Sequence, residues 1–253
     1  MAINYNGYAT QTPNDYYRGL AQAFIDQSWT NNAAKTPENG DSDIYEQNGI
    51  GSSEFNKIEA WVKNTVGDVT SGMKDSADFL KIYFRDIGHT VPRGLYYKFH
   101  DNWWICNEYG HFSGIADDAG LRRCNNFLRI IDPESGELFT IPCVVDYDMS
   151  SPSAQVSRYI ITPNNHAVVM CQGNADTIRL FQTNKRFILG GRPFKLYGYQ
   201  NAINLNLETQ YDTLLYLDLY LDEIHDKDDL VNQVAYNGEN SSDGWEGLID
   251  GGE

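Results

Sequence analysis

One stretch decides the fold, RCNNFLRIIDPESGELFTIPCVV, which runs from Arg123 to Val145. Two apolar, β-branched runs lie on either side of the turn sequence DPESG. Asp132 and Pro133 suit the first two positions of a type I turn, and Gly136 can take the positive φ with which the chain enters the second run. The stretch therefore predicts a β-hairpin.

Residue alternation assigns a core face to each strand of this hairpin. Leu128 and Ile130 lie on the same side of the outgoing strand. Pro142 has no amide proton to donate, so we expect the return strand to lie at a sheet edge, or at least to turn that position outward. The residues that share one face of the return strand are Phe139, Ile141, Cys143 and Val145.

Similar strand and turn signals continue through residues 79–224. The clearest is the strict alternation of leucine with tyrosine or aspartate in LLYLDLYLDE, residues 214–223. We expect about nine short strands joined by turns and no βαβ unit. This pattern predicts a mainly β fold, an antiparallel β-barrel or sandwich, with an N-terminal helix and an acidic, flexible C-terminal tail.

The predicted domain organisation has three parts, an N-terminal arm (1–53), a β-domain (54–225) and an acidic tail (226–253). The tail is rich in Gly, Asp, Asn and Glu and has few apolar anchors. We therefore expect it to be mobile unless a partner orders it, and expect its removal to leave the fold intact.

Within the arm, residues 13–29 predict an amphipathic helix that a polar linker follows. Apolar side chains recur at i, i+3, i+4 and i+7, the spacing of one helix face. This face either packs on the chain's own domain or docks on a neighbouring subunit, and the sequence leaves both alternatives open. The candidate subunit-interface residues are Tyr16, Tyr17, Leu20, Phe24 and Trp29.

Composition narrows the classes of partner. Hydrophobic residues make up 41% of the 253 residues, enough for a core, and the 17 tyrosines are typical of protein interfaces. A net charge of −16 argues against dedicated binding to DNA or to an anionic membrane, which requires clustered lysine and arginine. We expect no membrane span and no signal peptide. The four cysteines are expected to be buried thiols of a reducing compartment, at Cys106, Cys124, Cys143 and Cys171.

The chain shows no constellation of reactive residues, so we expect no enzyme, no catalytic residue, no metal site and no cofactor. The five histidines are scattered, without the short spacing of a metal site. The segment Gly49-Ile50-Gly51 lacks the lysine of a phosphate-binding loop. Trp103 and Trp104 invite a sugar-stacking interpretation, but neighbours in a strand point to opposite faces, so at most one ring can line a platform.

Three segments resemble head–tail joining proteins of tailed bacteriophages, of the head-closure, neck-connector or lower-collar type. They are FLKIYFRDIGHTVPRGLYYKFHDNWWIC, LRRCNNFLRIIDPESGELFTIPCVVDYD and IRLFQTNKRFILGGRPFKLYGY, within residues 79–200. The shared pattern includes an Arg-Cys-Asn-Asn hairpin with a Pro-Cys return and an Asn-x-Arg-Phe strand before a glycine hairpin. None of these motifs is a catalytic fingerprint.

This resemblance implies a structural virion protein, made in the host cytoplasm, that forms a homo-oligomeric ring of about twelve subunits. The ring would contact the portal protein and tail proteins, and genomic DNA would pass through its lumen without specific binding. An acidic lumen would repel DNA and let it slide. The alternative function is a carbohydrate- or protein-binding β-sandwich module of a phage tail or fibre.

Overall fold

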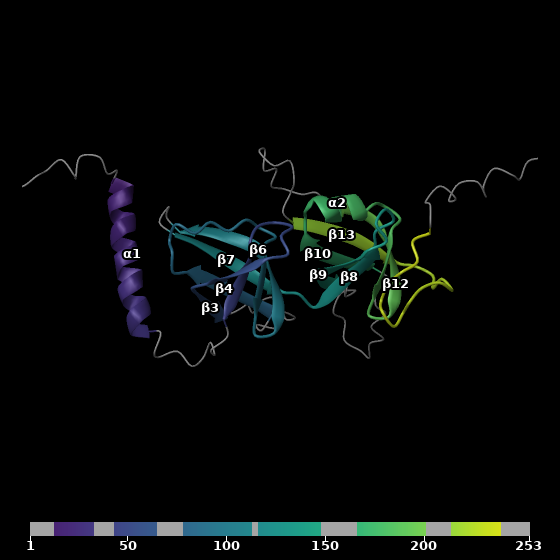
Figure 1. Cartoon of the computed structure of the whole chain (residues 1–253), viewed down its shortest axis with the longest axis horizontal. Helices are drawn as coiled ribbons and strands as arrows, with labels where there is room; N and C mark the ends of the chain where they lie inside the picture. Colours follow the sequence, from purple (N-terminus) through teal and green to yellow (C-terminus); the bar gives the residue numbers. More distant parts are fainter. Residues whose placement is uncertain are drawn as a thin grey trace, which may run out of the picture. The chain divides into compact units, whose positions relative to one another are not determined.

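A computed structural model describes residues 13–32, 43–64, 78–112, 116–147, 166–200 and 214–238. The chain divides into two compact units, Met1–Arg123 and Cys124–Glu253, and each unit has its own sheet and its own apolar core (Figure 1). The sequence predicted one β-domain over residues 54–225. The chain instead forms two units there, because its strands segregate into two separate sheets on either side of residue 123.

The N-terminal unit combines one helix with a seven-stranded sheet in the order β2-β1-β5-β6-β7-β4-β3, in which neighbouring strands are antiparallel. Its elements are α1 (Pro13–Asn32), β1 (Ile44–Gln47), β2 (Phe55–Ile58), β3 (Ala60–Asn64), β4 (Phe79–Phe84), β5 (Tyr96–Phe99), β6 (Asn102–Phe112) and β7 (Ala116–Arg123).

A bend at Glu59 brings the two ends of this sheet together. β2 pairs with β1 at one end of the strand order, β3 pairs with β4 at the other end, and only Glu59 separates β2 from β3 in the chain. The backbone N–H of Arg85 donates to the Glu59 carbonyl at 3.0 Å and fixes the bend. The sheet therefore curves into a nearly closed barrel around the core. β1 lies within the predicted polar linker, and its Gln47 is buried, so the arm predicted over 1–53 contributes a strand to this barrel.

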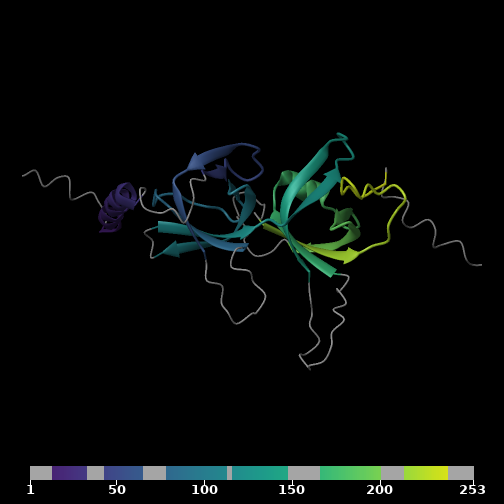
Figure 2. The same ribbon diagram turned by 90° about the horizontal axis from the view of Figure 1, so that it is seen from below.

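The C-terminal unit contains a six-stranded antiparallel sheet in the order β11-β12-β13-β10-β9-β8 and a short helix. Figure 2 shows its strands curving around an interior. Its elements are β8 (Asn126–Ile131), β9 (Leu138–Tyr147), β10 (His166–Gln172), α2 (Ala175–Leu180), β11 (Arg186–Leu189), β12 (Arg192–Gln200) and β13 (Leu214–Leu221).

The structure confirms the predicted hairpin, which forms β8 and β9. Leu128 pairs with Ile141 and both lie in the core, together with Ile130, Cys143 and Val145. Gly136 takes a φ of 72° and donates its N–H to the Asp132 carbonyl at 2.8 Å, which closes the turn. The alternative that β9 is an edge strand is wrong, because β9 lies between β8 and β10. Pro142 has no amide proton, and β9 tolerates it because the pairing of β9 with β10 begins only at the next residue, Cys143.

Two further predictions are confirmed and one element is new. Gly190 and Gly191 have φ values of 58° and 77° and form the turn between β11 and β12. Three of the four alternating leucines of β13, Leu215, Leu217 and Leu219, enter the core, whereas Leu221 at the end of the strand is exposed. Helix α2 was not expected, and a capping box begins it, because the Asn174 side chain accepts from the Thr177 N–H while the Thr177 hydroxyl accepts from the Asn174 N–H.

Candidate functional site

Helix α1 presents an apolar face to solvent. Phe24 is 70% exposed, and the remaining exposed large side chains of the helix are Tyr16, Tyr17 and Leu20. Tyr17, Leu20 and Phe24 follow one another at i, i+3 and i+7, so they lie on one side of the helix. Four of the five candidate interface residues are therefore exposed, and this face does not pack on the core of its own unit.

The opposite side of α1 is fixed to the N-terminal barrel by a side-chain amide and an aromatic stack. The Gln22 amide nitrogen donates to the Arg85 carbonyl at 2.9 Å, and its oxygen accepts from the Ile87 N–H at 3.0 Å. Trp29 stacks on Trp61 with ring centroids 4.6 Å apart. The fifth candidate, Trp29, is thus part of this intramolecular attachment and not of the exposed face.

Arg85, directly after β4, adds an ionic clasp to this attachment. Its Nε donates to Asp26 on α1 at 2.8 Å, and its Nη1 donates to Glu59 at 2.6 Å. The Arg85 side chain keeps 34% of its surface exposed, so water and salt weaken the pair. The clasp orients α1 without burying charge.

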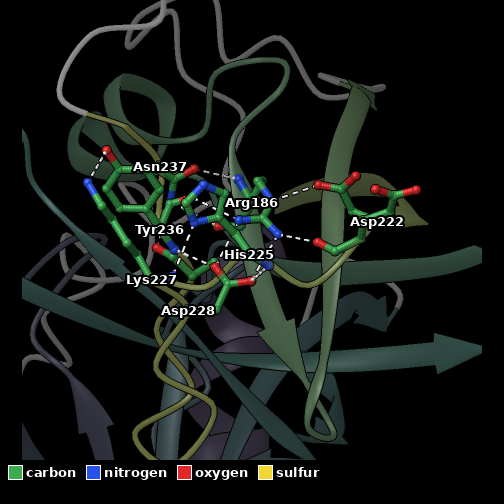
Figure 3. Close-up of polar contacts among 9 residues, drawn as sticks. Arg186, Asp222, His225, Lys227, Asp228, Tyr236 and Asn237 are labelled. Atoms are coloured by element: carbon green, nitrogen blue, oxygen red, sulfur yellow. Dashed lines mark hydrogen bonds and ion pairs between the residues drawn. The ribbon is translucent and has the colours of Figure 1, made fainter.

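A second arginine, Arg186 on β11, lies within a cluster of acceptors (Figure 3). Its two terminal nitrogens donate to both carboxylate oxygens of Asp228, at 2.8 and 3.0 Å. Nε donates to Asp222 at 2.6 Å, and the carbonyls of Glu223 and Tyr236 accept at 2.5 and 3.0 Å. A guanidinium has five N–H donors, and these contacts engage all five. The cluster is therefore structural, since Arg186 has no donor left for a ligand.

Asn237 completes the attachment of the C-terminal segment to the same strand. Its side-chain oxygen accepts from the Arg186 N–H at 2.6 Å, and its nitrogen donates to the Arg186 carbonyl at 3.1 Å. β11 is an edge strand, so these bonds satisfy backbone groups that the sheet leaves unpaired.

Residues 226–238 also reach the other edge strand, β8. Arg129 donates from Nη1 to the Asn232 carbonyl at 2.8 Å, while Arg186 holds Asp228 and Tyr236. β8 and β11 lie close together without a hydrogen-bonded ladder. The segment therefore covers the open seam of the barrel, which differs from the tail that the sequence predicted to start at residue 226. Residues 239–253 lie outside the described part of the chain.

The carboxylates that anchor the C-terminal unit are held in their charged form. Arg179 donates to both oxygens of Asp132 at 2.9 Å and holds the pKa of this carboxyl well below its usual range, with help from the Glu134 N–H. Burial acts to raise the pKa of Asp228, but hydrogen bonds from Arg186 outweigh it, so the pKa of Asp228 is lowered. Both carboxylates therefore favour the folded unit when they are ionised.

Several residues that sequence analysis considered for chemistry occupy structural positions. None of the four cysteines forms a disulfide, three of them are buried, and burial raises the pKa of the Cys106 thiol to about 12. Trp104 is buried and stacks on Phe99, as expected if neighbouring rings point to opposite faces. Trp103 is half-buried, and the Lys98 ammonium lies 4.0 Å from its ring centroid. A sugar ring stacked on that face would have to displace Lys98.

The described residues contain neither a metal-binding cluster nor a membrane-spanning helix. Among these residues, no three His, Cys, Asp or Glu side chains form a group that could hold a metal ion. Over the same residues, no helix has the length and apolar character needed to cross a membrane.

Comparison with known proteins gives one family. The model of the YomX C-terminal domain, a phage-derived protein family, matches residues 95–218, from just before β5 into β13. The match supports the predicted phage origin, whereas the head–tail joining role stays a prediction. Helix α1 and the segment 226–238 lie outside the matched region. Neither the curated proteins nor the solved structures contain a match to the chain.

Proposed function

We propose that this chain is a structural, non-enzymatic protein of a phage virion, one subunit of a ring below the portal that joins the capsid to the tail. The observation that carries the proposal is the exposed apolar face of α1, with Phe24 70% exposed on a helix whose other side is fixed to its barrel. A surface helix ordinarily turns its apolar face inward. Here the face is held outward, where a neighbouring subunit can cover it.

Burial of the apolar face of α1 would contribute favourable free energy to association. Full burial of a leucine or phenylalanine side chain gains about 1.5–3 kcal/mol. Tyr16 and Tyr17 add amphipathic rings of the kind that are enriched at protein interfaces. Because Gln22, Arg85 and Trp61 already orient the helix, less conformational entropy is lost on docking than for a free peptide.

The phage-derived family match and the charge of the chain support the position in the virion. A net charge of −16 opposes phosphate binding, so a ring of such subunits would let genomic DNA pass without retaining it. The partners in this proposal are further copies of the chain, the portal protein and tail proteins, with DNA in the lumen.

The test is the mass of the purified full chain in solution, alone and mixed with portal particles, by native mass spectrometry and electron microscopy. We expect a discrete ring, or stoichiometric addition to the portal. Phe24→Glu should reduce assembly at least tenfold. The matched control is Tyr197→Glu, which adds the same charge at an exposed aromatic residue of the C-terminal unit. A wild-type chain that stays monomeric under both conditions would contradict the proposal.

A further inference from the structure

The turn that follows β4, residues 85–89, connects helix α1 to the interior of the N-terminal barrel. The Gln22 side chain of α1 bonds to a carbonyl and to an N–H of this turn. At the far end of the turn, His89 Nε2 lies 2.9 Å from Glu46 Oε2 on β1. One short segment therefore holds the helix and also carries one member of a histidine–carboxylate pair.

Two hydrogen bonds inside the turn tie His89 to the residues that contact α1. The Gly88 N–H donates to Asp86 Oδ1 at 2.8 Å, and the His89 N–H donates to the Asp86 carbonyl at 3.1 Å. The Phe84 ring packs on the imidazole with centroids 4.3 Å apart. A displacement of His89 therefore also moves the backbone groups to which Gln22 bonds.

Glu46 is the more covered member of the pair. Its side chain is 13% exposed, against 26% for His89. The hydroxyl of the buried Tyr97 donates to the same carboxylate oxygen at 2.8 Å. Burial and the charge of Glu46 raise the pKa of Tyr97 well above its usual value, so this hydroxyl keeps its proton. A covered carboxylate with one neutral donor is stabilised further when its second partner carries a positive charge.

His89 also borders a cleft of about 440 Å³ between α1 and the barrel, through which water reaches the imidazole. Carboxyl and guanidinium groups ordinarily titrate far from neutral pH, whereas an ordinary histidine titrates near about 6.5. His89 is therefore the group of this cleft whose charge we expect to change near neutral pH. The other charged groups that line the cleft are Asp26, Glu59, Arg85 and Asp86.

We propose that the turn 85–89 is a pH-sensitive latch for α1. Protonated His89 forms an ion pair with Glu46 and holds the turn, and with it the helix, on the barrel. When the pH rises and His89 loses its proton, Glu46 is left with neutral donors, the Tyr97 hydroxyl and the imidazole N–H. Because protonation favours the attached state, attachment of α1 is strongest below about pH 6 and weakens above about pH 7. The latch acts within a single chain, so it does not depend on the proposed ring.

The experiment follows the attachment of α1 in the full-length Phe24→Glu chain, so that assembly does not affect the result. Hydrogen-exchange protection of α1 peptides, relative to the intrinsic exchange rate at each pH, should fall about three- to tenfold between about pH 6 and 8. The midpoint should lie within about one unit of 6.5. The far-ultraviolet circular dichroism couplet of the stacked Trp29 and Trp61 should weaken over the same range, and Trp29→Phe identifies this signal.

Two variants remove the charge change and one matched control keeps it. His89→Gln retains a side-chain N–H that can donate to Glu46 but cannot become charged, so its protection should be independent of pH at the high-pH level. Glu46→Gln should give a similarly flat profile and decides the test if His89→Gln does not fold. His166→Gln is the control, because His166 pairs with a carboxylate, Asp218, in the C-terminal unit. This control should keep the original profile.

The pH profiles separate a latch from a fixed structural contact. A flat profile in the starting chain would overturn the latch, because the neutral hydrogen bond would then hold the turn as well as the ion pair does. A profile that persists in His89→Gln or Glu46→Gln, or that disappears in His166→Gln, would overturn it too. None of these results bears on the ring, which the mass of the wild-type chain tests separately.

Discussion

Arg85 in the N-terminal unit and Arg186 in the C-terminal unit each hold a segment from near one end of the chain against a barrel. The Arg85 side chain is 34% exposed, and its partners Asp26 and Glu59 are more exposed still. The Arg186 side chain is 14% exposed, and that of Asp228 is fully covered. The arginine–carboxylate pair is therefore solvent-exposed in the N-terminal unit and covered by protein in the C-terminal unit.

The difference indicates what each attached segment does. An exposed ion pair contributes little to stability, so Arg85 helps to orient α1 without adding much to the stability of its attachment. Removal of one partner of a covered pair leaves an uncompensated charge, so the segment around Asp228 is an integral part of its barrel. The N-terminal clasp thus suits a helix that must contact another molecule, and the C-terminal clasp suits the closure of a seam.

The largest effect is expected for Arg186→Met, which leaves Asp228 covered without a cation. We expect the C-terminal unit to lose about 3–5 kcal/mol of unfolding free energy. Urea unfolding followed by hydrogen exchange of peptides from β10 and β13 measures it. Lys195→Met is the matched control, because Lys195 is the exposed cross-strand partner of Arg186. A loss of unfolding free energy below about 1 kcal/mol would show that the Arg186 pair contributes no more to stability than an exposed ion pair such as that of Arg85.

Removal of the segment 226–238 is expected to lower the stability of the C-terminal unit by less than Arg186→Met does. A chain ending at His225 should be less stable in its C-terminal unit than a chain ending at Gly238, because β11 loses Asn237 and Arg186 loses Asp228. Arg186→Met should then cost much less in the shorter chain than in the longer one, since the two changes act on one cluster. Additive losses would show that Arg186 and the segment act independently.

Acid is expected to destabilise the C-terminal unit. The folded-state pKa values of Asp132 and Asp228 are lowered, so both stabilise the fold above the unfolded value of about 3.9, and this stabilisation is lost as the pH falls below it. We expect hydrogen exchange in the C-terminal unit to accelerate below about pH 4. Asp132→Asn should flatten this dependence and lower stability at neutral pH. If Asp132→Asn leaves the pH dependence of hydrogen exchange unchanged, titratable groups other than Asp132 cause it.

The smallest effect on stability is expected for Arg85→Ala. Exchange of backbone amides in peptides from α1 should accelerate, while the unfolding midpoint of the N-terminal barrel stays almost constant, because the ion pair is exposed. Arg18→Ala, on the exposed surface of the same helix, should change neither quantity. A marked drop in the midpoint would show that α1 supports its barrel as strongly as residues 226–238 support theirs.

Local sequence predicted the elements whose signals are short-range. The DPESG turn with alternating apolar residues predicted β8 and β9, and the paired glycines predicted the β11–β12 turn. The apolar stripe of α1 predicted a helix with one apolar face. In each case the turn residues or the spacing of the side chains suffices, because the interactions involved lie within a few residues.

Only the tertiary structure determined the features that depend on residues far apart in the sequence. Pro142 suggested an edge strand, but whether β9 lies at an edge depends on β10, which begins beyond residue 165. Residues 226–238 looked like a tail because their few apolar side chains predict little burial, whereas their attachment comes from Arg129 and Arg186, far away in sequence. The division at residue 123 and the outward orientation of the α1 face likewise follow from long-range pairing, which composition and periodicity do not encode.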